Sequence, residues 1–342
     1  MSQHSDDPDG NVSLWMSNYH SYQDSTSQSG FTRGYSDQAS TIFPVEYYKD
    51  SFYLWILTSV TIVGFLGNTV SIVTIVRLHP VTSSSLCIIF LALADTLSLL
   101  SKTAYMQLSF HNVNIGHSGC KIFPYLMNTL PMIANWIIVV MTTERFVATW
   151  YPLWIYKIST LRTTSMVTFG IVMFFLAINS VHLILFEQVS DSRSRYYCLP
   201  HQDFKHFIVK IWFWTEGSFA VILPCISLIA LNSLIVIGAR KSCQPGSVQK
   251  RKQQVQLTAM LVTVSAMFIL LTIPGVIFSI VIGKWHYYAS PDLKNASTTV
   301  RILSDLNHSI NFFLYFLTGR RFRRHLFLAN LESQRPRRAQ SV

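Results

Sequence analysis

The sequence predicts an all-α membrane protein, a bundle of seven transmembrane helices followed by a short amphipathic eighth helix, with the N-terminus extracellular. Composition is the first observation: 50% of the 342 residues are hydrophobic and only 13% are charged, against about 25% in an average soluble domain. The apolar residues also fall in long runs, and the basic residues gather in segments that would lie on one side of a membrane.

Seven apolar runs approach or exceed the roughly 20 residues that a helix needs to cross a bilayer core. Four of them contain no Asp, Glu, Lys or Arg, and each of the other three contains a single acidic residue. A soluble protein built from such runs would have no amphipathic helix to face water. In order, the runs are 54–76, 83–101, 122–142, 163–186, 211–239, 255–282 and 302–318, of which the last is the shortest.

Lys and Arg concentrate in alternate connections and in the C-terminal tail, and the formal net charge is +11. Basic loops mark the cytoplasmic side, so we expect a multi-pass plasma-membrane protein with its N-terminus outside. The basic tail is then expected to face anionic membrane lipids rather than nucleic acid. This gives a disordered extracellular tail at 1–51, the seven-helix bundle at 52–318, and an amphipathic helix with a basic cytoplasmic tail at 319–342.

Two features of the outer side concern covalent modification. Asn11 and Asn295 each begin an Asn-x-Ser glycosylation triplet, although such triplets also occur by chance. Cys120 and Cys198 are the only two of the five cysteines that the predicted topology places outside. Thiols in an oxidising compartment most simply pair with each other, so we expect a Cys120–Cys198 disulfide.

Short motifs occur in order along the predicted helices, and together they resemble those of the rhodopsin-like (class A) G-protein-coupled receptors. That resemblance implies a receptor that binds an extracellular ligand and engages a heterotrimeric G protein and arrestin, and not an enzyme. No metal-ligand cluster, nucleophile motif or Gly-rich phosphate loop competes with it. The matching residues are Gly67-Asn68, Leu91 to Asp95, Glu144-Arg145-Phe146, Pro224, Phe268, Pro274, and Asn311 with Tyr315.

The resemblance assigns G-protein coupling and activation to a further set of residues. Glu144 is expected to pair with Arg145 in the inactive state; alternatively, Arg145 only extends its side chain to the membrane surface. Phe268, Pro274, Asn311 and Tyr315 complete the expected activation set.

Several positions depart from the family pattern: the fourth helix has no Trp, and Asn232 replaces the fifth-helix Tyr. Thr272 replaces the sixth-helix Trp, and Asn135 replaces an aliphatic core residue. Phe312 replaces the seventh-helix Pro, which should straighten that helix.

Asp95 lies alone in the second run, where a charge is costly and is a functional hypothesis by default. In the family this Asp helps to hold an allosteric sodium ion, and here Asn68, Asn307 and Asn311 would supply polar neighbours. Ala134 stands where a Ser ligand is common. The alternative is a protonated Asp95 in a hydrogen-bonded network. No other cofactor is expected.

The remaining charges point to the outer half of the bundle as the ligand site. Lys102 lies two helical turns beyond Asp95, and we expect it to pair with Asp305 because lone charges in apolar helices need partners; a water-filled cavity is the alternative. Glu216 and Arg301 are either ligand contacts or interfacial charges. The full set of ligand-binding candidates is Lys102, Tyr105, Gln107, Met127, Glu216, Arg301 and Asp305.

An extracellular basic peptide is the expected ligand. The outer tail carries more acidic than basic residues, and acidic surfaces attract cations. Met127 replaces the Asp that holds amines in aminergic receptors of the family. Leu271-Thr272-Ile273-Pro274 resembles the sixth-helix motif of some invertebrate neuropeptide receptors, including FMRFamide receptors. A lipid or small-molecule receptor is the alternative within the family, and a transporter or channel is the alternative outside it.

Overall fold

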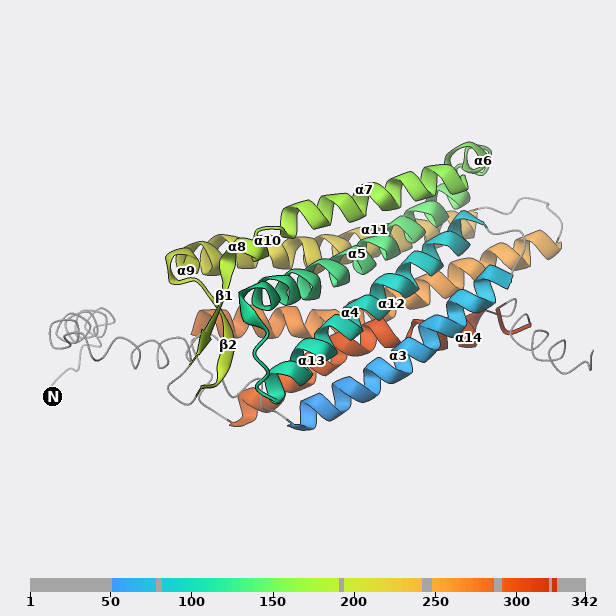
Figure 1. Cartoon of the computed structure of the whole chain (residues 1–342). Coiled ribbons are helices and arrows are strands. Elements are labelled where there is room, and N and C mark those ends of the chain that lie inside the picture. The colour runs from blue at the N-terminus through green and yellow to red at the C-terminus, as the bar shows by residue number, and fades with distance from the viewer. Residues whose placement is uncertain are drawn as a thin grey trace, which may run out of the picture.

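The computed structural model describes residues 51–77, 82–190, 194–241, 248–285, 291–319 and 322–324. Long helices run side by side, and a two-stranded hairpin lies at one end of the bundle (Figure 1). We call that end the disulfide end and the opposite end, where the short helix α6 (Ile155–Ile158) lies, the α6 end. Asn11, the predicted outer tail up to residue 50 and most of the predicted eighth helix lie outside the described residues.

The long helices alternate in direction along the chain (Figure 1). Within the described residues, six stretches are long and apolar enough to cross a membrane: Ser51–Arg77, Ser83–Phe110, Gly116–Trp150, Leu161–Leu185, Lys210–Arg240 and Thr258–Val281. The helices concerned are α3 (Ser51–Arg77), α4 (Ser83–Phe110), α5 (Gly116–Trp150), α7 (Leu161–Asn179), α8 (His182–Leu185), α11 (Leu223–Lys241) and α12 (Val248–Trp285).

The seventh predicted crossing is formed by α13 (Pro291–Ser309) and α14 (Asn311–Thr318), which together lie along the bundle but are not among those six. The expected straight helix is interrupted at Ile310, although no Pro is present. The backbone at Ile310 stays right-handed, and its N–H still donates to Leu306 O at 3.1 Å. The Ser309 hydroxyl donates to the same carbonyl, a local bond that competes with regular helix.

Helix α5 is central to the bundle, since it contacts α4, α7, α11 and α12, while α3 packs on α4, α13 and α14. The main apolar core surrounds α5, and Ile137, Phe175, Leu228 and Phe268 are among its fully buried side chains. At the edge of the bundle, a Cβ added at Gly64 would lie 3.2 Å from the Cα of Ser309. The absence of a side chain at this glycine therefore lets α3 approach the α13–α14 break.

The fifth crossing is irregular near the disulfide end. Its elements are η2 (Gln202–Phe204), α9 (Lys205–Phe207), the π-helical η3 (Ile208–Trp212), α10 (Phe213–Gly217) and the π-helical η4 (Ser218–Ile222), followed by α11. Two donors from α5 reach η4: Asn135 Nδ2 bonds Ala220 O and Trp136 Nε1 bonds Phe219 O, each at 2.8 Å. Asn135 thus binds the backbone of the π turn, which explains a polar residue at a position that is usually aliphatic.

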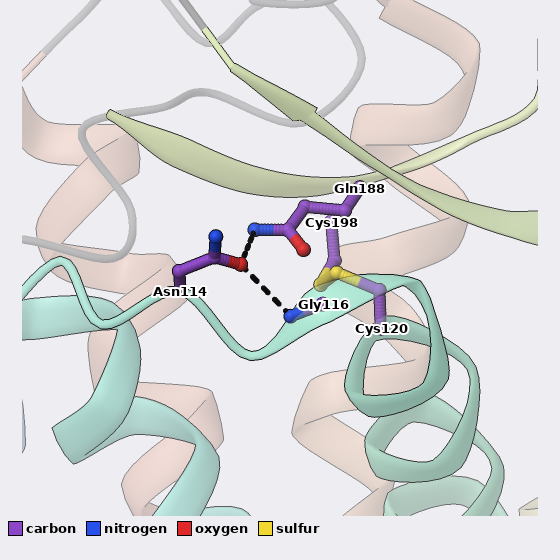
Figure 2. Close-up of a disulfide and its surroundings, with 5 residues drawn as sticks. All are labelled: Asn114, Gly116, Cys120, Gln188 and Cys198. Atoms are coloured by element: carbon purple, nitrogen blue, oxygen red, sulfur yellow. Dashed lines mark hydrogen bonds between the residues drawn. A yellow bond between two sulfur atoms is a disulfide. The ribbon is translucent and has the colours of Figure 1, made fainter. Parts of the chain in front are cut away.

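A hairpin of β1 (Phe186–Ser190) and β2 (Tyr196–Pro200) forms where the sequence indicates only a connection, and Gln188 pairs with Cys198 across it. The predicted disulfide is confirmed, joining Cys198 to Cys120 in the first turns of α5. Figure 2 shows Asn114 beside this bond, accepting from Gly116 N at 3.0 Å and from Gln188 Nε2 at 2.8 Å. Covalent and polar bonds therefore hold the hairpin against the α4–α5 connection.

Candidate functional site

Lys102 and Asp305 form the ion pair that was expected from the sequence. Lys102 Nζ on α4 lies 2.5 Å from Asp305 Oδ1 on α13. Asp305 is 4% exposed, whereas the Lys102 side chain is 26% exposed. The pair joins two neighbouring helices in the half of the bundle nearer the disulfide end, and it satisfies a charge that would be costly alone.

Tyr53, on a third helix, α3, also binds this ion pair. Its hydroxyl donates to Asp305 Oδ2 at 2.8 Å, and its ring is fully buried. The guanidinium carbon of Arg301 lies 4.9 Å from the centre of that ring, within range of a cation–π contact. Two cations and one carboxylate therefore surround a single buried Tyr that the sequence analysis did not identify.

The other candidates on α4 and α5 lie close to this cluster. Gln107 Nε2 donates to Thr58 Oγ1 at 3.1 Å, which joins α4 to α3. Tyr105 is buried with its ring 5.6 Å from that of Phe123, in the apolar cluster beneath the disulfide. Met127 is partly buried and packs against the same cluster.

Glu216 lies across the bundle from that cluster, in α10 between the two π-helical turns. The side chain is partly buried, and no hydrogen bond or ion pair joins it to another residue in the described part of the chain. One turn earlier, Trp212 is buried and its Nε1 donates to His182 Nε2 at 3.3 Å. A buried aromatic side chain therefore precedes Glu216 by one turn, and π turns of this kind are frequent at functional sites.

Asp95 is the centre of a buried polar group halfway along the bundle, which we call the Asp95 centre: Asn68, Asp95, His308 and Asn311. Asp95 Oδ1 shares a hydrogen bond with His308 Nδ1 at 2.6 Å, and Asp95 Oδ2 accepts from Asn311 Nδ2 at 2.7 Å. Asn68 Nδ2 donates to His308 O at 3.4 Å. The centre therefore links α3 and α4 to both parts of the seventh crossing.

The remaining residues of the expected activation set lie on α12 and α14. Phe268 is fully buried in the main core, and its carbonyl accepts from the hydroxyl of Thr272, two residues before Pro274, at 2.6 Å. Tyr315 is buried on α14 with its ring 6.2 Å from that of Phe322. Asn307 is buried next to His308, but no side-chain bond is found between it and Asp95.

Glu144 and Arg145 lie together at the α6 end, near the first turn of α4. The Arg145 Nη2 atom lies 3.5 Å from Glu144 Oε1 and also donates to the Ser84 hydroxyl. Glu144 Oε1 accepts from Ser83 at 2.8 Å, from Ser84 at 2.9 Å and from Ser159 at 2.5 Å. The start of α4 also favours a nearby anion.

Asn295, the predicted outer glycosylation site within the described residues, is exposed in α13 rather than in a loop. Its carbonyl accepts from the Thr299 hydroxyl at 2.8 Å.

The arrangement has the chemistry of a binding protein with two separated polar ends. Charged side chains near the disulfide end can recognise a charged ligand, and the ion pair at the α6 end can hold helices together until a partner displaces it. Several residues of these groups were missed, namely Tyr53, Ser83, Ser84 and Ser159, because no local signal distinguishes them from ordinary packing or first-turn residues. A lone His in an apolar run is ordinarily a hydrogen-bonded packing residue, and His182 and His308 are both buried and hydrogen-bonded.

The comparisons with known proteins agree with this geometry. The family described as 7 transmembrane receptor (rhodopsin family) matches residues 67–315. A Homo sapiens protein named probable G-protein coupled receptor 32 is 25% identical over 287 residues, covering 80% of this chain and 79% of its own.

Two further relatives are named for quite different ligands. The cysteinyl leukotriene receptor 2 of Mus musculus is 22% identical over 302 residues, which cover 87% of this chain and 96% of that receptor. The C5a anaphylatoxin chemotactic receptor 1 of Oncorhynchus mykiss is 25% identical over 276 residues, which cover 78% of this chain and 77% of that receptor.

Proposed function

The chain belongs to the rhodopsin family of seven-transmembrane receptors, and from that premise we propose that it binds a basic peptide at its disulfide end. Binding there favours the state that activates a heterotrimeric G protein at the α6 end. A ligand shifts such an equilibrium only by its different affinity for the two states. At least one group of the ligand site must therefore contact the ligand differently in the two states.

The orientation of the bundle supports a ligand from outside the cell. Disulfides persist in oxidising compartments, and the Cys120–Cys198 bond lies at the disulfide end. The opposite end carries Lys157 in α6 and Arg162 in the first turn of α7, as the positive-inside rule requires of a cytoplasmic face. We propose that the receptor lies in the plasma membrane in this orientation.

The proposal of a basic ligand rests on the carboxylate of Glu216. A carboxylate in an apolar helix is costly unless it is paired, and this one has no polar partner among the described residues. A Lys, Arg or amino group of a ligand would supply the missing charge and a charge-assisted hydrogen bond. By contrast, Asp305 across the bundle already holds Lys102 at 2.5 Å and Tyr53 at 2.8 Å.

A peptide fits better than an anionic lipid. The same Glu216 that attracts a cation would repel a lipid carboxylate. The outer tail adds to this attraction, because its acidic residues outnumber its basic ones and would raise the local concentration of cations. A small monoamine would lack its usual partner, because Met127 occupies that position in α5 and packs in an apolar cluster.

A physical connection exists between Glu216 and the α6 end. Glu216 lies in α10, directly before η4, and two carbonyls of η4 are bonded by Asn135 and Trp136 of α5. The same helix carries Arg145 nine residues later. A ligand that pulls on α10 would therefore act on α5 through the π turn.

At the α6 end, Glu144 and Ser84 hold Arg145 in the described conformation. Release of this contact would expose a cation to the G protein, and we propose that arrestin binds at the same end. Because Ser83, Ser84 and Ser159 share one carboxylate oxygen of Glu144, the restraint is distributed over α4, α5 and the connection after α6.

The test is a charge cycle between receptor and ligand. Basic neuropeptides, including Phe-Met-Arg-Phe-amide, are assayed for G-protein activation, and the Arg or Lys of an active peptide is replaced by Gln. Loss of a charge-assisted bond of about 1.5–3 kcal/mol should lower the potency of the parent peptide on Glu216→Gln by about 10- to 100-fold. The Gln-substituted peptide should be equally weak on both receptors.

Asp203→Asn provides the matched control, since it removes a carboxylate that is 80% exposed at the same end. It should leave potency unchanged. Equal potency of the parent peptide on wild type and Glu216→Gln would overturn the assignment of Glu216. A potency that rises in Glu216→Gln, with anionic lipids as the active compounds, would replace the peptide proposal by a lipid one.

A further inference from the structure

Each residue of the Asp95 centre is hydrogen-bonded to another member of the centre. Both oxygens of Asp95 are bonded, one to the imidazole of His308 and one to the amide of Asn311. Asp95 is 1% exposed, and the other members are also buried. His308 in addition receives the Asn68 amide on its carbonyl, so it joins α13 to α3 and α4 at once.

These residues do not fit the sodium ion that the family resemblance implies. A hard cation takes several oxygen ligands, about six in well-formed sites. Here the His308 ring nitrogen lies 2.6 Å from Asp95 Oδ1, so a shared proton occupies the side of the carboxylate that an ion would need. Ala134 is buried and offers no side-chain oxygen. The Asn68 Oδ1 atom is buried without a partner in the described part of the chain, but a single neutral amide oxygen does not complete a site.

We infer that this receptor holds no sodium ion at Asp95 and that the imidazole of His308 takes the structural place of the ion. The imidazole performs the task that an ion would perform, because it satisfies the buried carboxylate and connects α4 to the seventh crossing. The stability of the receptor is therefore independent of sodium. Replacing His308 by a residue with a small hydroxyl side chain creates a sodium site where the natural chain has none.

The experiment needs no ligand, so it does not depend on the proposed function. The purified full-length receptor is heated in NaCl and in KCl at equal ionic strength, and Tm is compared. The wild type should unfold at the same temperature in both salts. His308→Ser, and the double variant with Ala134→Ser, should gain a sodium-specific rise of about 2 °C or more, as expected for an ion that binds only the folded state.

Adding Asp95→Asn to the responsive variant should abolish the rise, which assigns it to this carboxylate. A sodium-specific rise in the wild type that Asp95→Asn removes would overturn the inference, whether or not the His308 variants fold. Folded His308→Ser and double variants that respond equally to both salts would also overturn it, because His308 would then not be the group that excludes the ion.

Discussion

Asp305→Asn tests whether the Lys102–Asp305 pair stabilises the bundle. Removing one partner of a buried ion pair costs about 3–5 kcal/mol. Lys102 is 26% exposed, so water can solvate part of its charge, and Asn retains an oxygen that can accept from Tyr53. We therefore expect a loss of about 2 kcal/mol in the free energy of unfolding. Thermal unfolding of the purified receptor should show this as a fall in Tm of about 4–8 °C.

A double-mutant cycle separates the pair from its surroundings. Lys102→Met should destabilise by a similar amount, while the double variant Lys102→Met with Asp305→Asn removes both charges of the pair. Its loss should be smaller than the sum of the single losses by at least about 1 kcal/mol. Lys157→Met, at an exposed position of α6, is the control and should lie within about 0.5 kcal/mol of the wild type. Strictly additive losses would show that the two charges do not stabilise each other.

Three further substitutions, one of them with a matched control, test other parts of the structure. Ser84→Ala removes a hydroxyl that both Glu144 and Arg145 contact. Loss of about 1 kcal/mol from the restrained state should raise ligand-free nucleotide exchange by the G protein up to about 5-fold. Unchanged exchange would contradict a restraining role for Ser84. Asn135→Leu frees a carbonyl of η4 and should lower stability by about 1–3 kcal/mol in thermal unfolding, whereas a Tm equal to that of the wild type would show that the π turn needs no such bond. Gly64→Ala places a Cβ 2.6 Å from a Leu side chain of α4 and should lower the free energy of unfolding by about 1–3 kcal/mol. Gly170→Ala, with open space around it, is the control and should be neutral or stabilising. Similar Tm values for these two glycine variants would show that close packing at Gly64 does not limit stability.

Much of the fold follows from single-residue properties that sequence reveals directly. Apolar runs mark the crossings because a bilayer admits few charges. The same rule predicts the Lys102–Asp305 pair, since two lone charges on neighbouring helices need each other. The disulfide follows from counting the thiols on the outer side. The cost of an unpaired charge in the bilayer leaves few alternatives for the crossings and the ion pair, and two outer thiols leave a single pairing for the disulfide.

The features that sequence reasoning missed depend on weaker or longer-range choices. His308 lies in an Asn-His-Ser triplet, and its sequence context does not distinguish it from a packing residue. Only the structure shows that its Nδ1 lies 2.6 Å from Asp95 Oδ1 on α4. Ser83 and Ser84 look like ordinary first-turn residues until Glu144, 60 positions later, lies beside them. The π turns of the fifth crossing have no composition of their own, and the donors that satisfy η4 come from another helix.

G-protein activation in cells that express this receptor and are exposed to a neuropeptide library tests the proposed function most directly. We expect that at least one basic peptide activates the wild type, and that Arg145→Ala reaches the cell surface but stays silent. A different result would contradict it: no peptide activates the wild type, and its basal signalling matches that of untransfected cells.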